Sequence, residues 1–330
     1  LRKQYKNDEE AKQIIDIALG LEGLRRQDGI HAAAIVISPD TITKFLPIQQ
    51  KGSNAEIVTQ YEMHTVEQLG LLKMDFLGLR NLSIVDRTLE LIGSESLDID
   101  NLKLDDEKTF KLFAEGKMTG VFQLESRVAQ STSRSLKPKR FEDIVALVAL
   151  IRPGPLGAGM HNEFADRANN RKEIEYLHND LESILNETYG VILYQEQVMQ
   201  IAEKIAGFNL QEADNLRVAM GKKIPKVMEE QRKKFTDGAV SNNYSEQFAI
   251  ELFDQIAYFA GYGFNKSHSV PYALLAYQTA YLKANYPAEY IAACLTAVKR
   301  DKDRTAIFLS EARDMGCLLY TSPSPRDCDR

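Results

Sequence analysis

Residues 71–80 read LLKMDFLGLR, which sets one acid and one base into an otherwise apolar run. Because successive side chains of a β-strand point to opposite faces, Lys73 and Asp75 are expected to share one face of a strand over Leu71–Phe76. Charged groups in so apolar a run must be paired, solvated or bound to a metal. Asp75 is therefore the first candidate functional residue, and a structural carboxylate that caps the following turn is an equal alternative.

The sequence around this strand predicts a mixed block that ends near residue 80. Apolar residues recur at helical spacing in residues 1–29, which predicts a helix there. Further short strands are expected over Ala34–Ile37, Thr41–Ile48 and Ile57–Tyr61, with polar turns between them.

After residue 80 the apolar periodicity is helical almost throughout. Acids at residues 105–107 stand at the start of one helix, where the helix dipole favours them, and another helix stops at the stiff turn of residues 152–155. Helices are expected over Asn81–Ile92, Lys108–Ala114, Phe141–Leu150, Gln195–Ile205, Leu210–Met220, Pro225–Asp237, Glu246–Phe259 and Tyr272–Ala284. The predicted fold class is α+β and mostly helical.

Length and composition narrow the classes of protein. At 330 residues the chain can hold one large domain or two smaller ones, and no apolar run is long enough to span a bilayer. The three cysteines lack the spacing of metal ligands, which fits a reducing, cytoplasmic setting. The chain begins at Leu1 inside a helical pattern, and we expect it to be a fragment of a longer protein.

Positive charge is concentrated in two clusters, although the net charge of −6 argues against a uniformly basic nucleic-acid binder. Residues 127–140 contain five cations and no acids, and residues 217–234 contain seven cations against two acids. Such clusters suit a phosphate backbone, because each contact releases condensed counterions. A solvated helix face is the ordinary alternative for either cluster.

One candidate binding segment lies at the end of a helix. Residues 217–223 read RVAMGKK, and Arg217, Lys222 and Lys223 could hold phosphates there. The same cations could instead complement the negative end of the helix dipole. Arg152, on a stiff Pro-Gly-Pro turn, is a weaker candidate of the same kind.

A second candidate segment, residues 261–268, reads GYGFNKSH. It combines glycines and aromatic rings with Asn265, Lys266 and His268, a mixture that suits base stacking and phosphate contacts. A glycine-rich turn between two helices is the alternative interpretation.

Two-metal nucleotidyl transfer needs several carboxylates around a pair of Mg²⁺ ions, which clamp the attacking and leaving oxygens. Asp75 suits one such ligand, with Lys73 on the same face available for a phosphate. Two Asp-x-Asp pairs, at residues 98–100 and 301–303, could supply the others, but both lie in polar segments beside helices and are expected to be solvated caps. If Asp75 is catalytic, its partner carboxylates are missing from this chain.

Taken together, these segments resemble the bacterial replicative DNA polymerases of family C, the DNA polymerase III alpha subunits. The matching stretches appear in the family's order from about residue 20 to Gly316, and they are Gly29–Ala34, Lys73–Leu79, Gly120–Ser126, Ala149–Pro155, Tyr189–Met199, Arg217–Lys223, and Gly261–His268 with Tyr272. Several motifs in register over this length are far more specific than any one of them.

The resemblance implies a domain plan. Residues 1–30 would form the end of the thumb, and residues 31–80 the C-terminal part of a palm similar to the polymerase-beta-type nucleotidyltransferase fold. Residues 81–316 would form a large helical fingers domain. Residues 317–330 break the helical pattern and resemble a translated vector scar, so a non-native tail is expected there.

The resemblance also implies roles for single residues. Asp75 matches the family's third catalytic aspartate and a Mg²⁺ ligand, and Lys73 lies beside it near the primer end or the incoming nucleotide. The candidates for contacts to nucleotide or DNA are Arg217, Lys222, Lys223, Asn265, Lys266, His268 and Arg152. The implied reaction is that of a DNA-directed DNA polymerase, with primer-template DNA and dNTPs as partners, and with the sliding clamp and other replicase subunits in the full-length protein.

Two departures from the family pattern limit these implications. The family's paired palm aspartates would precede Leu1, so this chain is not expected to polymerise alone, and Val218 stands where the family often has a second arginine. The alternative is a non-catalytic helical DNA-binding module that uses the two basic clusters, which predicts strongly salt-dependent binding.

Overall fold

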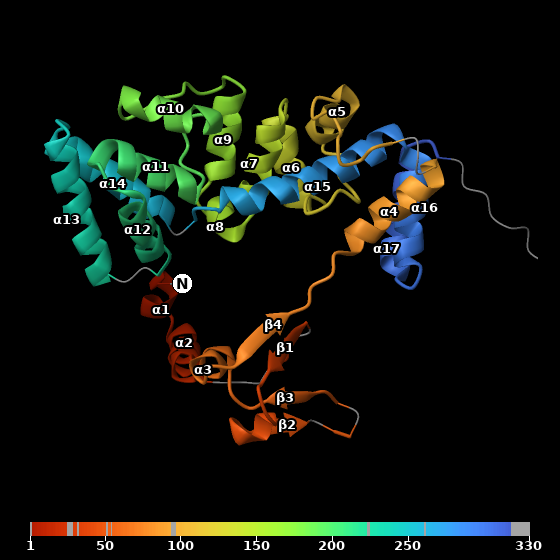
Figure 1. The fold of residues 1–330 in the computed structure, drawn as a ribbon, viewed down its shortest axis with the longest axis horizontal. Coiled ribbons are helices and arrows are strands. Elements are labelled where there is room, and N and C mark those ends of the chain that lie inside the picture. Colours follow the sequence, from red (N-terminus) through yellow and green to blue (C-terminus); the bar gives the residue numbers. More distant parts are fainter. Residues whose placement is uncertain are drawn as a thin grey trace, which may run out of the picture. The chain divides into compact units, whose positions relative to one another are not determined.

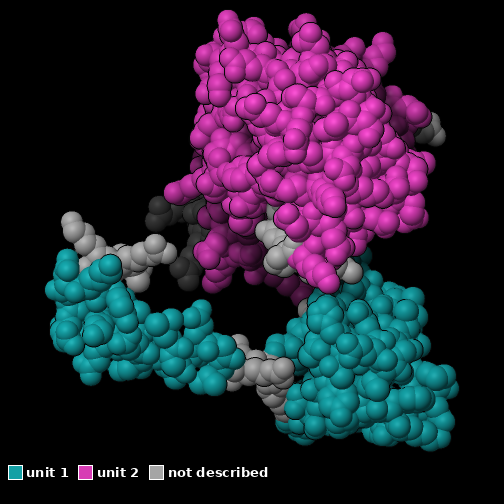
Figure 2. Space-filling view, turned by 90° about the vertical axis from the view of Figure 1, so that its left-hand side faces the viewer, with its two compact units in different colours: residues 1–79 teal, residues 80–330 magenta. Residues whose placement is uncertain are grey.

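The computed structural model describes residues 2–24, 29–31, 33–50, 52–53, 55–93, 97–222, 225–260 and 262–317. The chain forms two compact units, unit 1 over residues 1–79 and unit 2 over residues 80–330 (Figure 2). Unit 1 mixes short helices with short strands, and unit 2 is built from helices (Figure 1). The predicted mostly helical α+β fold class is confirmed.

Unit 1 contains two separate two-stranded sheets. Its elements in chain order are α1 (Arg2–Asn7), α2 (Glu9–Leu21), β1 (Ala34–Ile37), η1 (Ile42–Lys44), β2 (Ile48–Gln50), β3 (Ile57–Thr59), α3 (Met63–Gln68) and β4 (Leu72–Asp75). Strand β1 pairs antiparallel with β4, and β2 pairs antiparallel with β3. In the first pair Ala34 lies opposite Asp75 and Val36 lies opposite Lys73, so these four side chains share one face of the ribbon.

Three predictions for unit 1 need correction. The helix expected over residues 1–29 is broken at Asp8, whose carboxylate accepts from backbone N–H groups and starts α2, and α2 ends at Leu21. The strand expected over Thr41–Ile48 is wrong, because residues 42–44 form the 3₁₀ turn η1, in which the N–H of Lys44 donates to the carbonyl of Thr41 at 2.9 Å. The strand expected over Ile57–Tyr61 ends at Thr59.

Unit 1 has a small core and an exposed apolar face. The core consists of Leu46, Val66 and Leu71. On the ribbon face opposite Lys73 and Asp75, Ile35 is 55% exposed and Leu72 is 54% exposed. None of the described residues of α2 is buried either. The apolar residues of α2 and of this ribbon face are therefore left exposed within unit 1.

Unit 2 contains the remaining helices. They are α4 (Arg80–Ile92), α5 (Glu107–Glu115), α6 (Arg127–Leu136), α7 (Phe141–Leu150), α8 (Pro153–Gly157), α9 (Met160–Ala168), η2 (Asn179–Leu181), α10 (Glu182–Leu185), η3 (Asn186–Thr188), α11 (Gln195–Ala206), α12 (Leu210–Lys222), α13 (Pro225–Ser241), α14 (Glu246–Ala260), α15 (Lys266–Asn285), α16 (Pro287–Val298) and α17 (Lys302–Asp314). None of the described helices combines the length and apolar character that crossing a bilayer requires.

Helix α15 is the central element of unit 2. It packs against α5 and α7 along its length and reaches α4 and α16 near its C-terminal end (Figure 1). Its residues Ala273, Ala276 and Tyr277 lie in one large core with α5, α6, α7 and α9, and Leu275 and Leu282 lie in a second core with α4 and α16. A third core gathers α11 to α14.

The predicted helices of unit 2 are confirmed, with corrected bounds for α13, which ends at Ser241 rather than residue 237, and for α15. Helix α7 has the predicted bounds Phe141–Leu150. Helix α15 begins at Lys266 rather than residue 272, because Asn265 caps it by accepting from the N–H of His268 at 2.9 Å. Pro271 lies inside the helix. The predicted turn at residues 152–155 opens the short helix α8, with proline at its first position.

The helices α6, α9, α16 and α17 were not predicted from the sequence. Of the two Asp-x-Asp pairs only the second behaves as the expected cap: Asp301 accepts from the N–H of Arg304 at 3.0 Å at the start of α17. Asp98 accepts from the N–H of Asp100 at 3.2 Å in a turn at which no helix begins. Residues 318–330 lie outside the described residues.

The turn at residues 117–122 is held by helices far along the chain. Lys283 Nζ donates to the carbonyl oxygens of residues 117 and 119 at 2.7 and 2.8 Å, and the Tyr290 hydroxyl donates to that of residue 120 at 2.7 Å. The N–H of residue 122 donates to Thr279 Oγ1 at 3.1 Å. Gly120 has a φ of 83°, and a Cβ there would lie 3.1 Å from the Phe308 ring. The turn is thus fixed by side chains of α15 and α16.

Candidate functional site

The Lys73 and Asp75 side chains form an ion pair on one face of β4. Lys73 Nζ donates to Asp75 Oδ1 at 2.9 Å and to Oδ2 at 2.8 Å. The Lys73 side chain is 18% exposed and that of Asp75 is 38% exposed. The alternation of the sequence predicted the shared face, which is confirmed, and of the three alternatives left open for the charged groups the structure shows pairing.

A hollow of about 1260 Å³ in unit 1 lies beside this pair. Both sheets and α3 contribute to its wall, and the residues that define it best are His31, Val36, Ile48, Val58, Val66 and Lys73. The lining mixes apolar and polar side chains, and among its residues Lys73 supplies a positive charge while Glu56 and Glu62 supply carboxylates. The pair therefore lies where unit 1 could receive a ligand.

Asp75 is kept ionised by its surroundings. The hydrogen bonds from Lys73 hold the pKa of the Asp75 carboxyl below its usual range, against the opposing effect of desolvation. His31 Nδ1 lies 3.8 Å from Asp75 Oδ1 and accepts from the N–H of Ala33 at 3.3 Å.

The residues around Asp75 do not form a magnesium site by themselves. Among the described residues no group of three His, Cys, Asp or Glu side chains could hold a metal ion. Both oxygens of Asp75 accept from Lys73, and two-ion sites in proteins need several hard oxygen ligands. Asp75 can offer one ligand, and the described part of the chain does not supply the others.

Three of the seven cations in the basic cluster at residues 217–234 are paired with acids, whereas Lys226 and Lys233 are exposed. Arg217 Nε donates to Asp214 Oδ1 at 2.7 Å, and Lys234 Nζ donates to Glu212 Oε1 at 2.7 Å. Arg232 pairs with Asp254. Arg217 is 35% exposed at its side chain and still reaches solvent, whereas the Lys222 side chain and all of Lys223 lie outside the described residues. The positive charge that the sequence concentrates here is thus partly neutralised by acids on nearby helices.

Asn265, Lys266 and His268 come together at the start of α15. The ring of His268 lies 4.3 Å from that of Tyr272 and 5.5 Å from that of Phe264, between centroids, and His268 itself is exposed. Lys266 Nζ lies 2.7 Å from the Glu187 carboxylate. The segment expected to be a loop up to His268 therefore begins a helix at Lys266.

Arg152 is turned into the protein. Its Nε donates to the carbonyl of Ala149 at 2.9 Å, its Nη2 donates to the carbonyl of Tyr262, and its guanidinium lies over the Phe264 ring at 4.3 Å. Burial lowers the pKa of Arg152 from its ordinary value. Arg152 therefore holds the segment before α15 in place, through Tyr262 and Phe264, rather than facing solvent.

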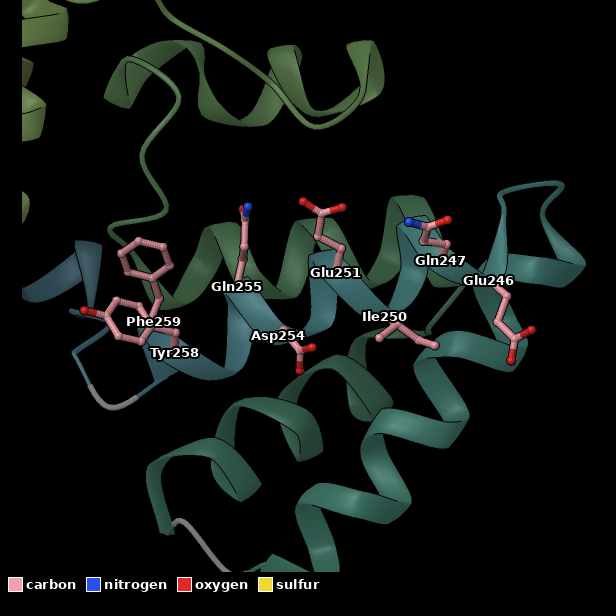
Figure 3. A pocket seen from close by; sticks show the side chains of 8 residues that line it. All are labelled: Glu246, Gln247, Ile250, Glu251, Asp254, Gln255, Tyr258 and Phe259. Atoms are coloured by element: carbon pink, nitrogen blue, oxygen red, sulfur yellow. The ribbon is translucent and has the colours of Figure 1, made fainter.

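A shallow hollow of about 740 Å³ runs along α14 (Figure 3). Figure 3 shows Gln247, Glu251 and Gln255 projecting from the same side of the helix, and Glu246 and Asp254 add further carboxylates to the lining. Its acidic lining repels phosphates, so it does not suit a DNA backbone.

Two acids that the sequence analysis did not single out complete the start of α15. Glu196, in the first turn of α11, accepts from the N–H of Lys266 at 3.0 and 2.9 Å, and Glu187 pairs with the Lys266 side chain. Both stand in or just before the quoted motif at residues 189–199. Their partners lie 70 and 79 residues away along the chain, which no local pattern reveals.

Comparison with known proteins matches most of the chain to one family. A family model described as the bacterial DNA polymerase III alpha NTPase domain matches residues 1–78, and one described as the bacterial DNA polymerase III alpha subunit finger domain matches residues 81–243. The two models meet where unit 1 meets unit 2.

Curated relatives extend the match over nearly the whole sequence. DNA polymerase III subunit alpha of Escherichia coli (strain K12) is 47% identical over 327 residues, which is 96% of this chain and 28% of that protein. The protein of the same name from Mycobacterium tuberculosis (strain ATCC 25618 / H37Rv) is 44% identical over 326 residues, 97% of this chain and 28% of that protein. The chain thus spans about 28% of the length of these relatives. The resemblance inferred from the motifs is confirmed, and the chain belongs to the family of the bacterial DNA polymerase III alpha subunits.

Proposed function

We propose that this chain is part of the catalytic subunit of a replicative DNA polymerase. In the proposed reaction the primer 3′-hydroxyl attacks the α-phosphorus of a dNTP, the new P–O bond extends the primer by one dNMP, and the bond to the leaving pyrophosphate breaks. The observation that carries the proposal is the ionised Asp75 held by Lys73 beside the hollow of unit 1, within a region that matches the family.

The proposal assigns the palm and the end of the thumb to unit 1, at residues 31–80 and 1–30, and the fingers to residues 81–316. Asp75 is proposed to give one carboxylate to a Mg²⁺ site, whose ions would stabilise charge on the transferred phosphate. The other carboxylates would come from residues outside this chain, so these 330 residues alone are proposed to be inactive. Lys73 orients Asp75 and offers a cation to a phosphate.

Unit 2 is proposed to bind the incoming dNTP and the primer-template. His268 and Asn265 are exposed at the start of α15, and Arg217 is only partly covered by its bond to Asp214. Lys222 and Lys223 stay candidates by their place in the motif. Lys266 and Arg152, which bind Glu187 and backbone carbonyls, are proposed to act through the shape of the segment before α15.

The whole protein is further proposed to work in the cytoplasm with the sliding clamp and other replicase subunits, as part of a DNA replication assembly. These proposals rest on the family alone. The pairing of Arg217, Arg232 and Lys234 with acids weakens the alternative of a DNA-binding module that works through the cluster at residues 217–234.

The test is primer extension by the full-length catalytic subunit that carries Asp75→Ala. We expect extension to fall by about 10³-fold or more, as for the loss of a catalytic group in other enzymes, with primer-template affinity unchanged. Asp40→Ala is the matched control, because Asp40 is also a lysine-paired acid of unit 1 and lies outside the strand that carries Lys73 and Asp75. Extension that survives Asp75→Ala would contradict the proposal.

A further inference from the structure

The segment before α15 is held against the start of α11 by backbone pairing. The N–H of Phe264 donates to the carbonyl of Leu193 at 3.1 Å, and the N–H of Gln195 donates to the carbonyl of Phe264 at 2.9 Å. The Gln195 side chain adds a bond to the carbonyl of Gly263 at 3.3 Å. Two stretches far apart in the sequence thus form one short parallel bridge.

Glu196 follows directly on this bridge and caps α15 from outside the helix. Its carboxylate accepts from the N–H of Lys266 at 3.0 and 2.9 Å and from the N–H of Ser267 at 3.4 Å. The next N–H, that of His268, is taken by the side chain of Asn265. The first N–H groups of a helix have no partner within the helix, and an acid there is also favoured by the helix dipole.

The same segment is fixed at two further points. Glu187 binds the Lys266 ammonium, which lies over the ring of Tyr194 at 5.6 Å. Arg152 covers the ring of Phe264 at 4.3 Å. Because Lys266 is already bound by a carboxylate, the groups that this segment leaves open to a ligand are on Asn265 and His268.

We propose that Glu196 is a positioning residue for the incoming nucleotide. By holding the first turn of α15, it sets the place of His268, whose ring lies between those of Phe264 and Tyr272. This inference rests on the proposed function, since it takes the start of α15 as part of the dNTP site. An acid exposed to the ligand would repel the phosphates of a dNTP. In Glu196, however, both carboxylate oxygens accept hydrogen bonds from the start of α15.

Replacement of Glu196 should weaken dNTP binding without slowing the chemical step. Glu196→Ala leaves two helix N–H groups without their acceptor and frees His268 from a fixed position. We expect the KM for dNTP to rise about tenfold, because charge-assisted hydrogen bonds are the stronger ones, while kcat changes by less than about twofold. Glu196→Gln keeps an acceptor oxygen and should return the KM to within about threefold of the wild-type value.

The measurement is steady-state extension on a primed template by the full-length catalytic subunit at varied dNTP. The matched control is Glu203→Ala, two turns further along α11, where the carboxylate makes no hydrogen bond or ion pair with described residues. Thermal unfolding of each variant reports any loss of folding. A wild-type KM in Glu196→Ala, or a Glu196→Gln variant as defective as Glu196→Ala, would overturn the proposal.

If Glu196 served only to stabilise the fold, the KM of the double variant with His268→Ala would differ from the value that the positioning role predicts. If Glu196 acts through His268, Glu196→Ala should add less than about twofold to the KM of His268→Ala, because the two changes remove one interaction. Effects that multiply would overturn the positioning role. The proposed polymerase function is contradicted by a different result, namely extension that survives Asp75→Ala. The failure of that function can therefore be distinguished from the failure of the positioning role.

Discussion

Lys73 donates to both carboxylate oxygens of Asp75 across a single intervening residue of β4. The pair needs only the alternation of one strand, so its geometry is local and does not depend on distant contacts. A lysine held in this way keeps Asp75 charged and fixes its direction. A charged carboxylate with a fixed direction is suited to bind a cation or a polar group of a ligand at a defined position.

The first prediction concerns the titration of Asp75. The hydrogen bonds from Lys73 lower its pKa in the folded chain, so the pair stabilises the fold above the unfolded pKa and loses this effect as the pH falls through the folded pKa. Lys73→Met should raise the pKa of Asp75. NMR titration of carboxyl-labelled aspartate would measure it, with Asp40, whose pKa is lowered by Lys44, as the internal control. An unshifted Asp75 in the variant would contradict the assignment.

The second prediction concerns the buried ion pair of unit 2. The Lys283 side chain is 1% exposed and lies 2.6 Å from Glu311 Oε1. Lys283→Met leaves the Glu311 carboxylate and two carbonyl groups without their donor, so we expect a loss of about 3–5 kcal/mol in the free energy of unfolding. Urea unfolding followed by circular dichroism would measure it.

Two variants sharpen this test. Lys283→Met combined with Glu311→Leu removes both charges and should recover part of the loss. Lys111→Met, at a surface pair in which Lys111 is 75% exposed, should change the free energy of unfolding by less than about 1 kcal/mol. Equal effects at the two sites would show that the burial of Lys283 has no energetic consequence.

The third prediction concerns the contact between α11 and α13. A Cβ at Gly238 would lie 2.2 Å from the carbonyl oxygen of Ala206, so Gly238→Ala must push the two helices apart. We expect a loss of about 1–3 kcal/mol in the free energy of unfolding. Gly221→Ala in α12 meets nothing within 4 Å and should instead stabilise by about 0.5–1 kcal/mol. A neutral Gly238→Ala would contradict this packing.

The fourth prediction concerns Tyr189, whose hydroxyl donates to Asp143 Oδ1 at 2.8 Å. Burial, with the nearby Asp143 charge, raises the pKa of Tyr189 to about 12. A raised tyrosine pKa stabilises the fold below the unfolded pKa of about 10, and this effect is lost as the pH rises toward the folded value. The stability advantage of the wild type over Tyr189→Phe should be about 1 kcal/mol at pH 8 and shrink between pH 10 and 12. Urea unfolding across this range would measure it, and a constant difference would contradict the assignment.

The features that the sequence predicted correctly are those fixed by near neighbours. The strand over Leu72–Asp75 follows from its alternation, and α7 follows from a continuous apolar run that ends before a proline. The strand expected over Thr41–Ile48 failed because residues 42–44 form a 3₁₀ turn closed by local backbone hydrogen bonds, such as that from the N–H of Lys44 to the carbonyl of Thr41. The helix expected from Tyr272 begins at Lys266, because Asn265 caps it and Pro271, six positions after the cap, is tolerated inside the helix.

The candidate site was predictable only in part, for the same reason. The Lys73–Asp75 pair is local, and the sequence indicates it directly. The pairing of Lys234 with Glu212 and of Lys266 with Glu187 joins residues 22 and 79 positions apart, so a count of cations overstated the charge that is free to bind phosphate. Glu196 was missed because its partners belong to a helix that begins 70 residues later.

The turn at residues 117–122 has a consequence for how the protein is made. Its backbone groups bind Thr279, Lys283 and Tyr290, which follow by 157 to 170 positions. While the ribosome is still producing α14, the early helices of unit 2 have emerged without the side chains that complete them. A truncation at residue 243, where the finger-domain match ends, would leave the turn permanently in that state. The smallest autonomous folding piece of unit 2 must therefore extend at least through α16.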